Sequence, residues 1–112
     1  MKLNNWNIHS AVYLWVSDQE NAINIYGLIQ EWDVSKVTNM GGLFNSTPFN
    51  QNIGGWDVSN VQSMPFVFFL ATSFNQDLSS WCVNNIPSIP IGFDAGATSW
   101  VLPKPVWGTC PP

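Results

Sequence analysis

The sequence predicts an α/β repeat solenoid of short right-handed coils, preceded by an N-terminal two-helix cap. Two observations carry this prediction. The segment W-D-V-S-K-V, which begins at Trp32, returns as W-D-V-S-N-V at Trp56 and in weaker form at Trp81, so the spacings are 24 and 25 residues. The phrase F-N-Q also recurs, at Phe49 and at Phe74. A fixed period of this length is typical of coils that stack and share a continuous core.

Each coil is expected to contain one short parallel strand and one helical turn. Trp-Asp-Val alternates apolar and polar residues, which predicts a strand with Trp and Val facing inward. Met40, Met64 and Ile89 begin segments with apolar residues at helical spacing, which predicts one helical turn per coil. Aromatic residues that recur in register should then form the core ladder, which comprises Trp32, Trp56, Trp81, Trp107, Phe44, Phe68 and Phe93.

The chain is expected to be one cooperative domain with two parts. Residues 1–27 form the helical cap, with a first helix over residues 7–16. Ser17, followed by Glu20 three residues later, predicts the N-cap of a second helix that ends at Gly27. Residues 28–112 form about three coils of 24–26 residues. Their proline-rich end serves as a C-terminal cap, because proline cannot donate to a further strand.

Composition excludes several classes of function. The 112 residues have a formal net charge of −4 and only 9% charged residues, so no basic surface for nucleic acid is expected. One His and two Cys are too few for a structural zinc site, and no nucleotide-binding or hydrolase motif occurs. The apolar runs are too short for a signal peptide or a membrane-spanning helix. We therefore expect no enzyme, no catalytic residue, no metal, no cofactor and no membrane insertion.

Three motifs together resemble a known family. The W-D-V-S-N-V segments, the M-x-x-x-F turn from Met40 to Phe44 and the phrase A-T-S-F-N-Q-D-L from Ala71 to Leu78 resemble the BspA-like surface repeats. These are the mycoplasma-type domain of unknown function 285, a relative of the leucine-rich repeats. The resemblance covers about residues 28–110 and implies leucine-rich-repeat-like coils. It also implies a non-enzymatic bacterial repeat module for protein binding or surface adhesion, secreted or on the cell surface, although this chain contains no signal peptide.

The two cysteines are candidates for a disulfide. Cys82 directly follows Trp81, and Cys110 lies three residues after Trp107. Adjacent coils about 4.8 Å apart would bring the two cysteines within the range that a disulfide requires. We favour this bridge over two unrelated thiols, and it would place the protein in an oxidising compartment.

Three apolar residues are expected to form a partner surface. When the turns after Met40, Met64 and Ile89 are aligned, Phe66 and Phe69 occupy positions where the first coil has Gly42 and Asn45. These positions should face solvent, and Ile91 should lie beside Phe66 in the next coil. An exposed apolar patch of this kind predicts a protein partner or self-association, for example a homodimer centred on Phe66 and Phe69. The alternative is that the tail from Val101 to Pro112 folds back over the patch.

The alternative function belongs to another class. A small hydrolase or carbohydrate-binding protein would have its site at the cap–solenoid junction, where Glu20, Glu31 and Asp33 are the nearby carboxylates. The in-register Asp33 and Asp57 could in principle share a calcium ion, but such a cation needs six or more oxygen ligands. We expect these two carboxylates, with Asp77, to cap backbone amides in turns instead.

Overall fold

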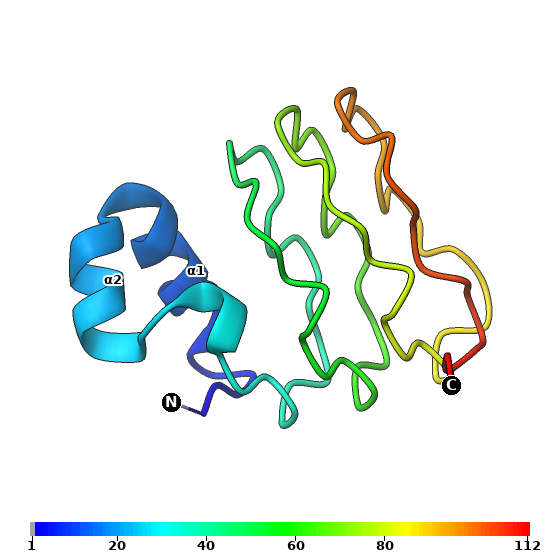
Figure 1. Cartoon of the computed structure of the whole chain (residues 1–112), viewed down its shortest axis with the longest axis horizontal. Coiled ribbons are helices and arrows are strands. Elements are labelled where there is room, and N and C mark those ends of the chain that lie inside the picture. The colour runs from blue at the N-terminus through cyan, green and yellow to red at the C-terminus, as the bar shows by residue number, and fades with distance from the viewer. Residues whose placement is uncertain (1) are drawn as a thin grey trace.

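The structure is a computed structural model that describes residues 2–112. It begins with helices α1 (Ile8–Ser17) and α2 (Gln19–Tyr26), followed by a short 3-10 helix η1 (Ile29–Glu31) (Figure 1). The face of α1 that was expected to be apolar is buried, with Ala11, Val12 and Trp15 in the core. Both helices therefore form close to their predicted places.

The start of α2 differs from the prediction by one residue. Asp18 is the N-cap, and its Oδ1 accepts a hydrogen bond from the backbone N–H of Asn21 at 3.2 Å. Ser17 is instead the last residue of α1, and its hydroxyl donates to the carbonyl of Tyr13. A carboxylate at the N-cap also interacts favourably with the helix dipole, which the serine hydroxyl cannot do. Gly27 ends α2 with a φ of 81°, as expected.

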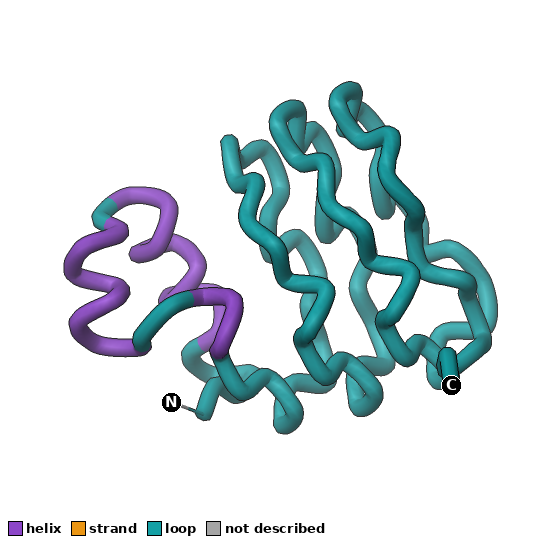
Figure 2. The backbone as a smooth tube through the Cα atoms, in the orientation of Figure 1, coloured by secondary structure: helices purple, strands orange, loops and turns teal. Residues whose placement is uncertain are grey.

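Beyond η1 the chain winds through three irregular coils, at residues 32–55, 56–80 and 81–106, which lie side by side (Figure 1). Figure 2 shows them as loop throughout. Over residues 2–112 the only strand-like pairings are two isolated bridges, Lys2 with Asp33 and Asn39 with Ser63. The predicted α/β repeat solenoid is therefore wrong: the described residues form no sheet, and their helices all lie before Trp32.

The Trp-Asp-Val segments do not extend into strands because their aspartates turn the chain. Asp33 accepts hydrogen bonds from both the backbone N–H and the hydroxyl of Ser35, two residues further on. A turn follows at once, in which the N–H of Val37 donates to the carbonyl of Val34 at 2.9 Å. Aspartate side chains commonly form such turns with the second following residue. The inward positions are nevertheless as predicted, since Trp32 and Val34 are both buried.

The expected helical turns are instead chains of tight turns. In the first coil, Leu43 and Asn45 donate their N–H groups to the carbonyls three residues before them, whereas the amide of Phe44 donates to Val67 of the next coil. Gly42 has a φ of 66° and Ser46 a φ of 59°. An α-helix needs negative φ throughout and hydrogen bonds four residues apart, so neither requirement is met.

Aromatic side chains in stacked columns form the core. The rings of Trp32 and Trp56 are stacked with centroids 6.4 Å apart, and those of Phe44 and Phe68 are stacked at 5.5 Å. The indole N–H groups are satisfied by the preceding segment: Trp56 donates to the carbonyl of Ile29 at 2.8 Å. In the same way, Trp81 donates to Ile53 at 2.9 Å and Trp32 to Gly27 at 3.0 Å. Trp107 is only partly buried and packs edge-on against Phe93 at 4.7 Å.

The third coil is shifted by one residue relative to the predicted alignment. The amides of Gly42 and Phe66 donate to Pro65 and Ile91 respectively, which places Gly92, not Ile91, in register with Phe66. Phe93 therefore lies in the column of Val67, and its ring is edge-on to Phe68 at 5.5 Å rather than stacked on it. Ile89, which follows Ile86 at the spacing of Met40 and Met64 in the earlier coils, is 57% exposed, whereas both methionines are buried. The cause is one extra residue between Ile86 and Phe93.

Candidate interaction surface

One edge of the coils carries a row of residues in the left-handed backbone region. Each coil contributes two of them, four residues apart, with φ between 56° and 79°: Gly42 and Ser46, then Phe66 and Leu70, then Gly92 and Gly96. A left-handed φ costs an ordinary L-residue about 1–2 kcal/mol, and more for bulky side chains. Only the second coil places large apolar residues at both positions, and such strain is concentrated at functional sites in proteins.

The glycines of the third coil make room for these two side chains. A Cβ atom added at Gly92 would collide with the ring of Phe66, and one at Gly96 would collide with Cδ2 of Leu70. The ring of Phe66 therefore lies directly over Gly92, and the side chain of Leu70 lies over Gly96. Both side chains cover glycine backbone while they keep an outer surface in solvent.

Phe66, Phe69, Leu70 and Ile91 together form what we call the apolar patch. Phe66 is 38% exposed and Ile91 is 72% exposed, whereas Phe69 is half-buried with its ring edge-on to Phe66 at 5.5 Å. Leu70, 45% exposed, was missed by the sequence analysis because its left-handed backbone was not foreseen. The signal that could have found it is its register with Gly96.

The C-terminal tail does not close over the patch by backbone pairing. The amides of Val101 and Leu102 both donate to the side-chain oxygen of Asn75, and the carbonyl of Pro103 accepts from Leu78. Further along, the carbonyl of Thr109 accepts from Val83. The tail therefore runs beside the 75–86 region, and Phe66 and Ile91 keep exposed surface.

The two cysteines are joined in the structure. A disulfide links Cys82 to Cys110, with Cα atoms 4.0 Å apart. Two backbone hydrogen bonds lie next to this link, within the loop that it closes: from Val83 to Thr109 at 2.9 Å and from Gly108 to Ile86 at 2.8 Å. The bridge thus holds the tail against the start of the third coil.

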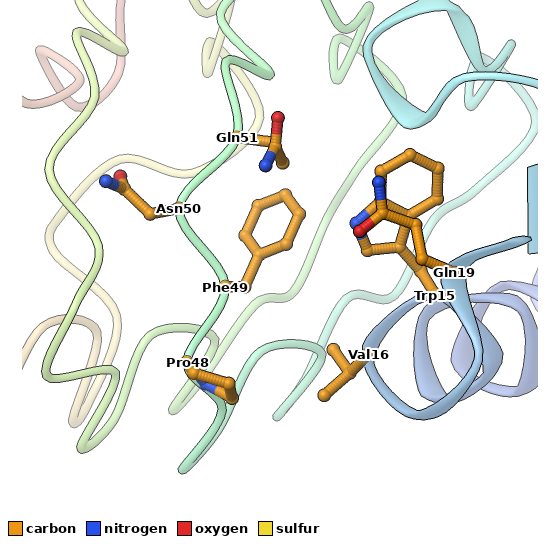
Figure 3. A pocket seen from close by; sticks show the side chains of 7 residues that line it. All are labelled: Trp15, Val16, Gln19, Pro48, Phe49, Asn50 and Gln51. Carbon is orange, nitrogen blue, oxygen red and sulfur yellow. The ribbon is translucent and has the colours of Figure 1, made fainter.

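The junction between the helices and the first coil contains two pockets but not the predicted carboxylates. In Figure 3, Trp15, Val16 and Gln19 face residues 48–51 across a pocket of about 130 Å³. A second pocket of about 350 Å³ lies at the same junction, lined by α1 and residues 42–48. Glu20, Glu31 and Asp33 line neither of them. The carboxylates expected at this junction are therefore not lining residues of either pocket.

His9 connects α1 to the first coil. Its Nε2 lies 2.8 Å from the carbonyl oxygen of Gly41. Because a carbonyl oxygen can only accept a hydrogen bond, Nε2 carries the proton. The carbonyl of Gly41 is in register with those of Pro65 and Ile91, which accept backbone N–H groups from the preceding coil. His9 thus takes the place of a backbone donor in front of the first coil.

The aspartates of the turns are structural, as expected from the sequence. Hydrogen bonds from the hydroxyl and the backbone N–H of Ser35 lower the pKa of Asp33, and Ser79 lowers the pKa of Asp77 in the same way. Asp57 makes the same two contacts with Ser59. Over residues 2–112 no three His, Cys, Asp or Glu side chains lie close enough to hold a metal ion.

The register of the second and third coils can be tested at one glycine. Gly92→Ala should lower the free energy of unfolding by about 2–3 kcal/mol. The alanine would have to keep the left-handed φ of Gly92, and its methyl group would collide with Phe66. Gly42→Ala is the matched control, since it has a φ of 66° but open space around a Cβ, and should cost about 1–2 kcal/mol. Urea unfolding measures both values.

A double-mutant cycle separates the collision from the backbone strain. In the background of Phe66→Gly, the cost of Gly92→Ala should fall to about that of Gly42→Ala, because the ring is gone. An unchanged cost in that background would mean that Phe66 does not lie over Gly92.

Comparison with known families assigns the chain to one of them. It belongs to the family described as Mycoplasma protein of unknown function, DUF285, whose model matches residues 10–100. Neither a curated protein nor a solved structure is significantly similar to the chain. Within residues 2–112, no helix has the length and apolar character needed to cross a membrane.

Proposed function

We propose that the chain is a non-enzymatic bacterial module that binds proteins through the apolar patch, in the manner of an adhesion domain. The observation that supports this most directly is the conformation of Phe66 and Leu70. Both are bulky and apolar, both are more than a third exposed, and both have positive φ. Exposed apolar patches mark contact surfaces, and strained residues persist where function needs them.

Two further features fit this proposal. The sequence motifs resemble the BspA-like surface repeats and, through them, the leucine-rich repeats, and we extend that relationship to this chain as part of the proposal. The disulfide between Cys82 and Cys110 is of a kind that persists in oxidising surroundings, which suits a secreted or surface protein. Burial of Phe66, Leu70 and Ile91 by a partner would supply the apolar centre of an interface.

The test uses a variant that removes the patch without straining the backbone. Phe66→Gly/Leu70→Gly deletes both side chains, and glycine is the residue best suited to the left-handed positions. Peptides selected from a random phage library on the wild-type protein should lose at least about tenfold in affinity for this variant, equivalent to about 1.4 kcal/mol. Ile25→Ser, an exposed apolar site on α2, is the matched control and should leave binding unchanged.

Sedimentation velocity tests whether the chain associates with itself through the patch. A concentration-dependent dimer of the wild type that is lost in Phe66→Gly/Leu70→Gly supports the patch, with a second copy as its occupant. Selected peptides that bind the double variant as well as the wild type, together with a wild type that stays monomeric, would overturn the proposal.

A further inference from the structure

At the edge that carries the left-handed residues, backbone N–H groups of each coil donate hydrogen bonds to carbonyls of the next coil. In both junctions every second residue donates, with N···O distances of 2.8–2.9 Å. The pairs from the first to the second coil are Gly42 to Pro65, Phe44 to Val67 and Ser46 to Phe69; those from the second to the third are Phe66 to Ile91, Phe68 to Phe93 and Leu70 to Ala95. The direction and the spacing are the same both times.

The third coil presents the same row of donors with nothing paired to it. By register, its donors are the N–H groups of Gly92, Asp94 and Gly96, and none of residues 2–112 accepts a hydrogen bond from them. Gly92 and Gly96 have φ values of 63° and 79°, so the backbone already has the conformation that the two paired rows have. These three amides point away from the second coil, because the carbonyls that precede them accept hydrogen bonds from it.

A second copy of the chain does not fit this edge well. Two such edges brought face to face would oppose donors to donors. The matching row of acceptors begins at the carbonyl of Gly41, and there α1 lies across it, with His9 bonded to that carbonyl at 2.8 Å. The chain's own tail is engaged elsewhere, through Asn75, Leu78 and Val83.

We propose that the amides of Gly92, Asp94 and Gly96 bind the main chain of an extended peptide segment from a partner protein, whose carbonyls at every second residue accept the three hydrogen bonds. This inference rests on the proposed function, and it names the kind of partner segment that binds at this edge of the third coil. The exposed side chain of Ile91 flanks the row, so apolar contact accompanies the main-chain pairing.

An ion pair between Asp94 and Lys104 limits which peptide residue can lie opposite Asp94, the middle one of the three donors. Asp94 is in register with Phe44 and Phe68, but its carboxylate pairs with Lys104 at 2.8 Å. The ammonium of Lys104 lies 5.3 Å from the ring centroid of Trp100, so the pair covers the end of the aromatic core. A peptide residue directed at this place meets two charges, which favours a polar side chain over an aromatic one.

The chain itself supplies a probe with suitable backbone geometry. In the fold, residues 88–98 present the carbonyls of Ile91, Phe93 and Ala95 to the second coil. A synthetic peptide of this sequence, with asparagine at the position of Asp94 to avoid two facing carboxylates, is titrated into the ¹⁵N-labelled full chain. The mirror-image peptide of D-residues is the control, because it has the same composition but the wrong backbone hand.

The amide protons of Gly92, Asp94 and Gly96 should move downfield as the L-peptide is added. They should also exchange with solvent about tenfold more slowly when the peptide is at ten times its Kd. The amides of Gly42 and Phe66 are already bonded to carbonyls and serve as internal controls that should not gain protection. The D-peptide should have none of these effects.

Other outcomes separate this inference from the proposed function. Shifts confined to the amides around Phe66 and Leu70, with no added protection of Gly92, Asp94 and Gly96, would leave the patch as a binding surface and overturn the edge pairing. Equal protection of the three amides in wild type and in Phe66→Gly/Leu70→Gly supports the edge pairing and counts against the role of the patch side chains. Protection that grows with protein concentration in the absence of peptide would overturn the partner-peptide assignment in favour of a second copy.

Discussion

Trp56→Ala should lower the free energy of unfolding by about 3–5 kcal/mol, which approaches the whole stability of a domain this small. The indole of Trp56 is buried in the middle of the stack, between Trp32 and Phe44, with ring centroids 6.4 Å and 6.0 Å away. Truncation leaves a cavity, and it also leaves the carbonyl of Ile29 without the indole donor that satisfies it. Urea unfolding followed by circular dichroism measures the loss.

Two companion variants make the result interpretable. Trp6→Ala removes an indole that is 93% exposed and should change the stability by no more than about 0.5 kcal/mol. Trp56→Phe keeps an aromatic ring but loses the N–H, so it should fall between the two. If Trp56→Ala were no more destabilising than Trp6→Ala, the central place of this ring in the core would be disproved.

The burial pattern was predictable from the sequence because it depends on side-chain chemistry that repeats. Trp32, Trp56 and Trp81 return with the same neighbours, and all three are buried with satisfied indole groups. The secondary structure was not predictable in the same way. Alternating polarity is compatible with any extended segment, whereas a sheet needs backbone pairing, and the aspartate–serine turns at Asp33 and Asp57 end each extended segment too early for that.

The third coil shows why the candidate patch was only partly foreseen. Both Ile91 and Gly92 could be aligned with Phe66. The first alignment matches Phe93 with Phe68, and the second matches Phe93 with Val67. The backbone hydrogen bond from Phe66 to Ile91 decides between them, and the recurrence of Met40, Met64 and Ile89 on which the predicted alignment was based points to the other one. With the observed register, glycines lie beside Phe66 and Leu70, which is the steric reason that these bulky residues are accommodated there.

Removal of the disulfide, in Cys82→Ser/Cys110→Ser, should lower the free energy of unfolding by about 3–4 kcal/mol. The bridge links residues 28 apart, and opening it returns the entropy of that loop to the unfolded chain. The folded state should change little, because the tail is still held by the hydrogen bonds from Val83 to Thr109 and from Gly108 to Ile86. Reductant should destabilise the wild type by the same amount and leave the double variant unaffected.

A local measurement distinguishes this loop effect from simple detachment of the tail. Trp107 is partly buried against Phe93, at a centroid distance of 4.7 Å, so its nearby amides report whether the tail stays docked. In the double variant, hydrogen exchange at Gly108 should remain slower than in an unfolded chain, because its N–H still donates to Ile86. If the amide of Gly108 exchanged freely while the unfolding midpoint stayed at the wild-type value, the bridge would only tether the tail, and the expected global loss of stability would be refuted.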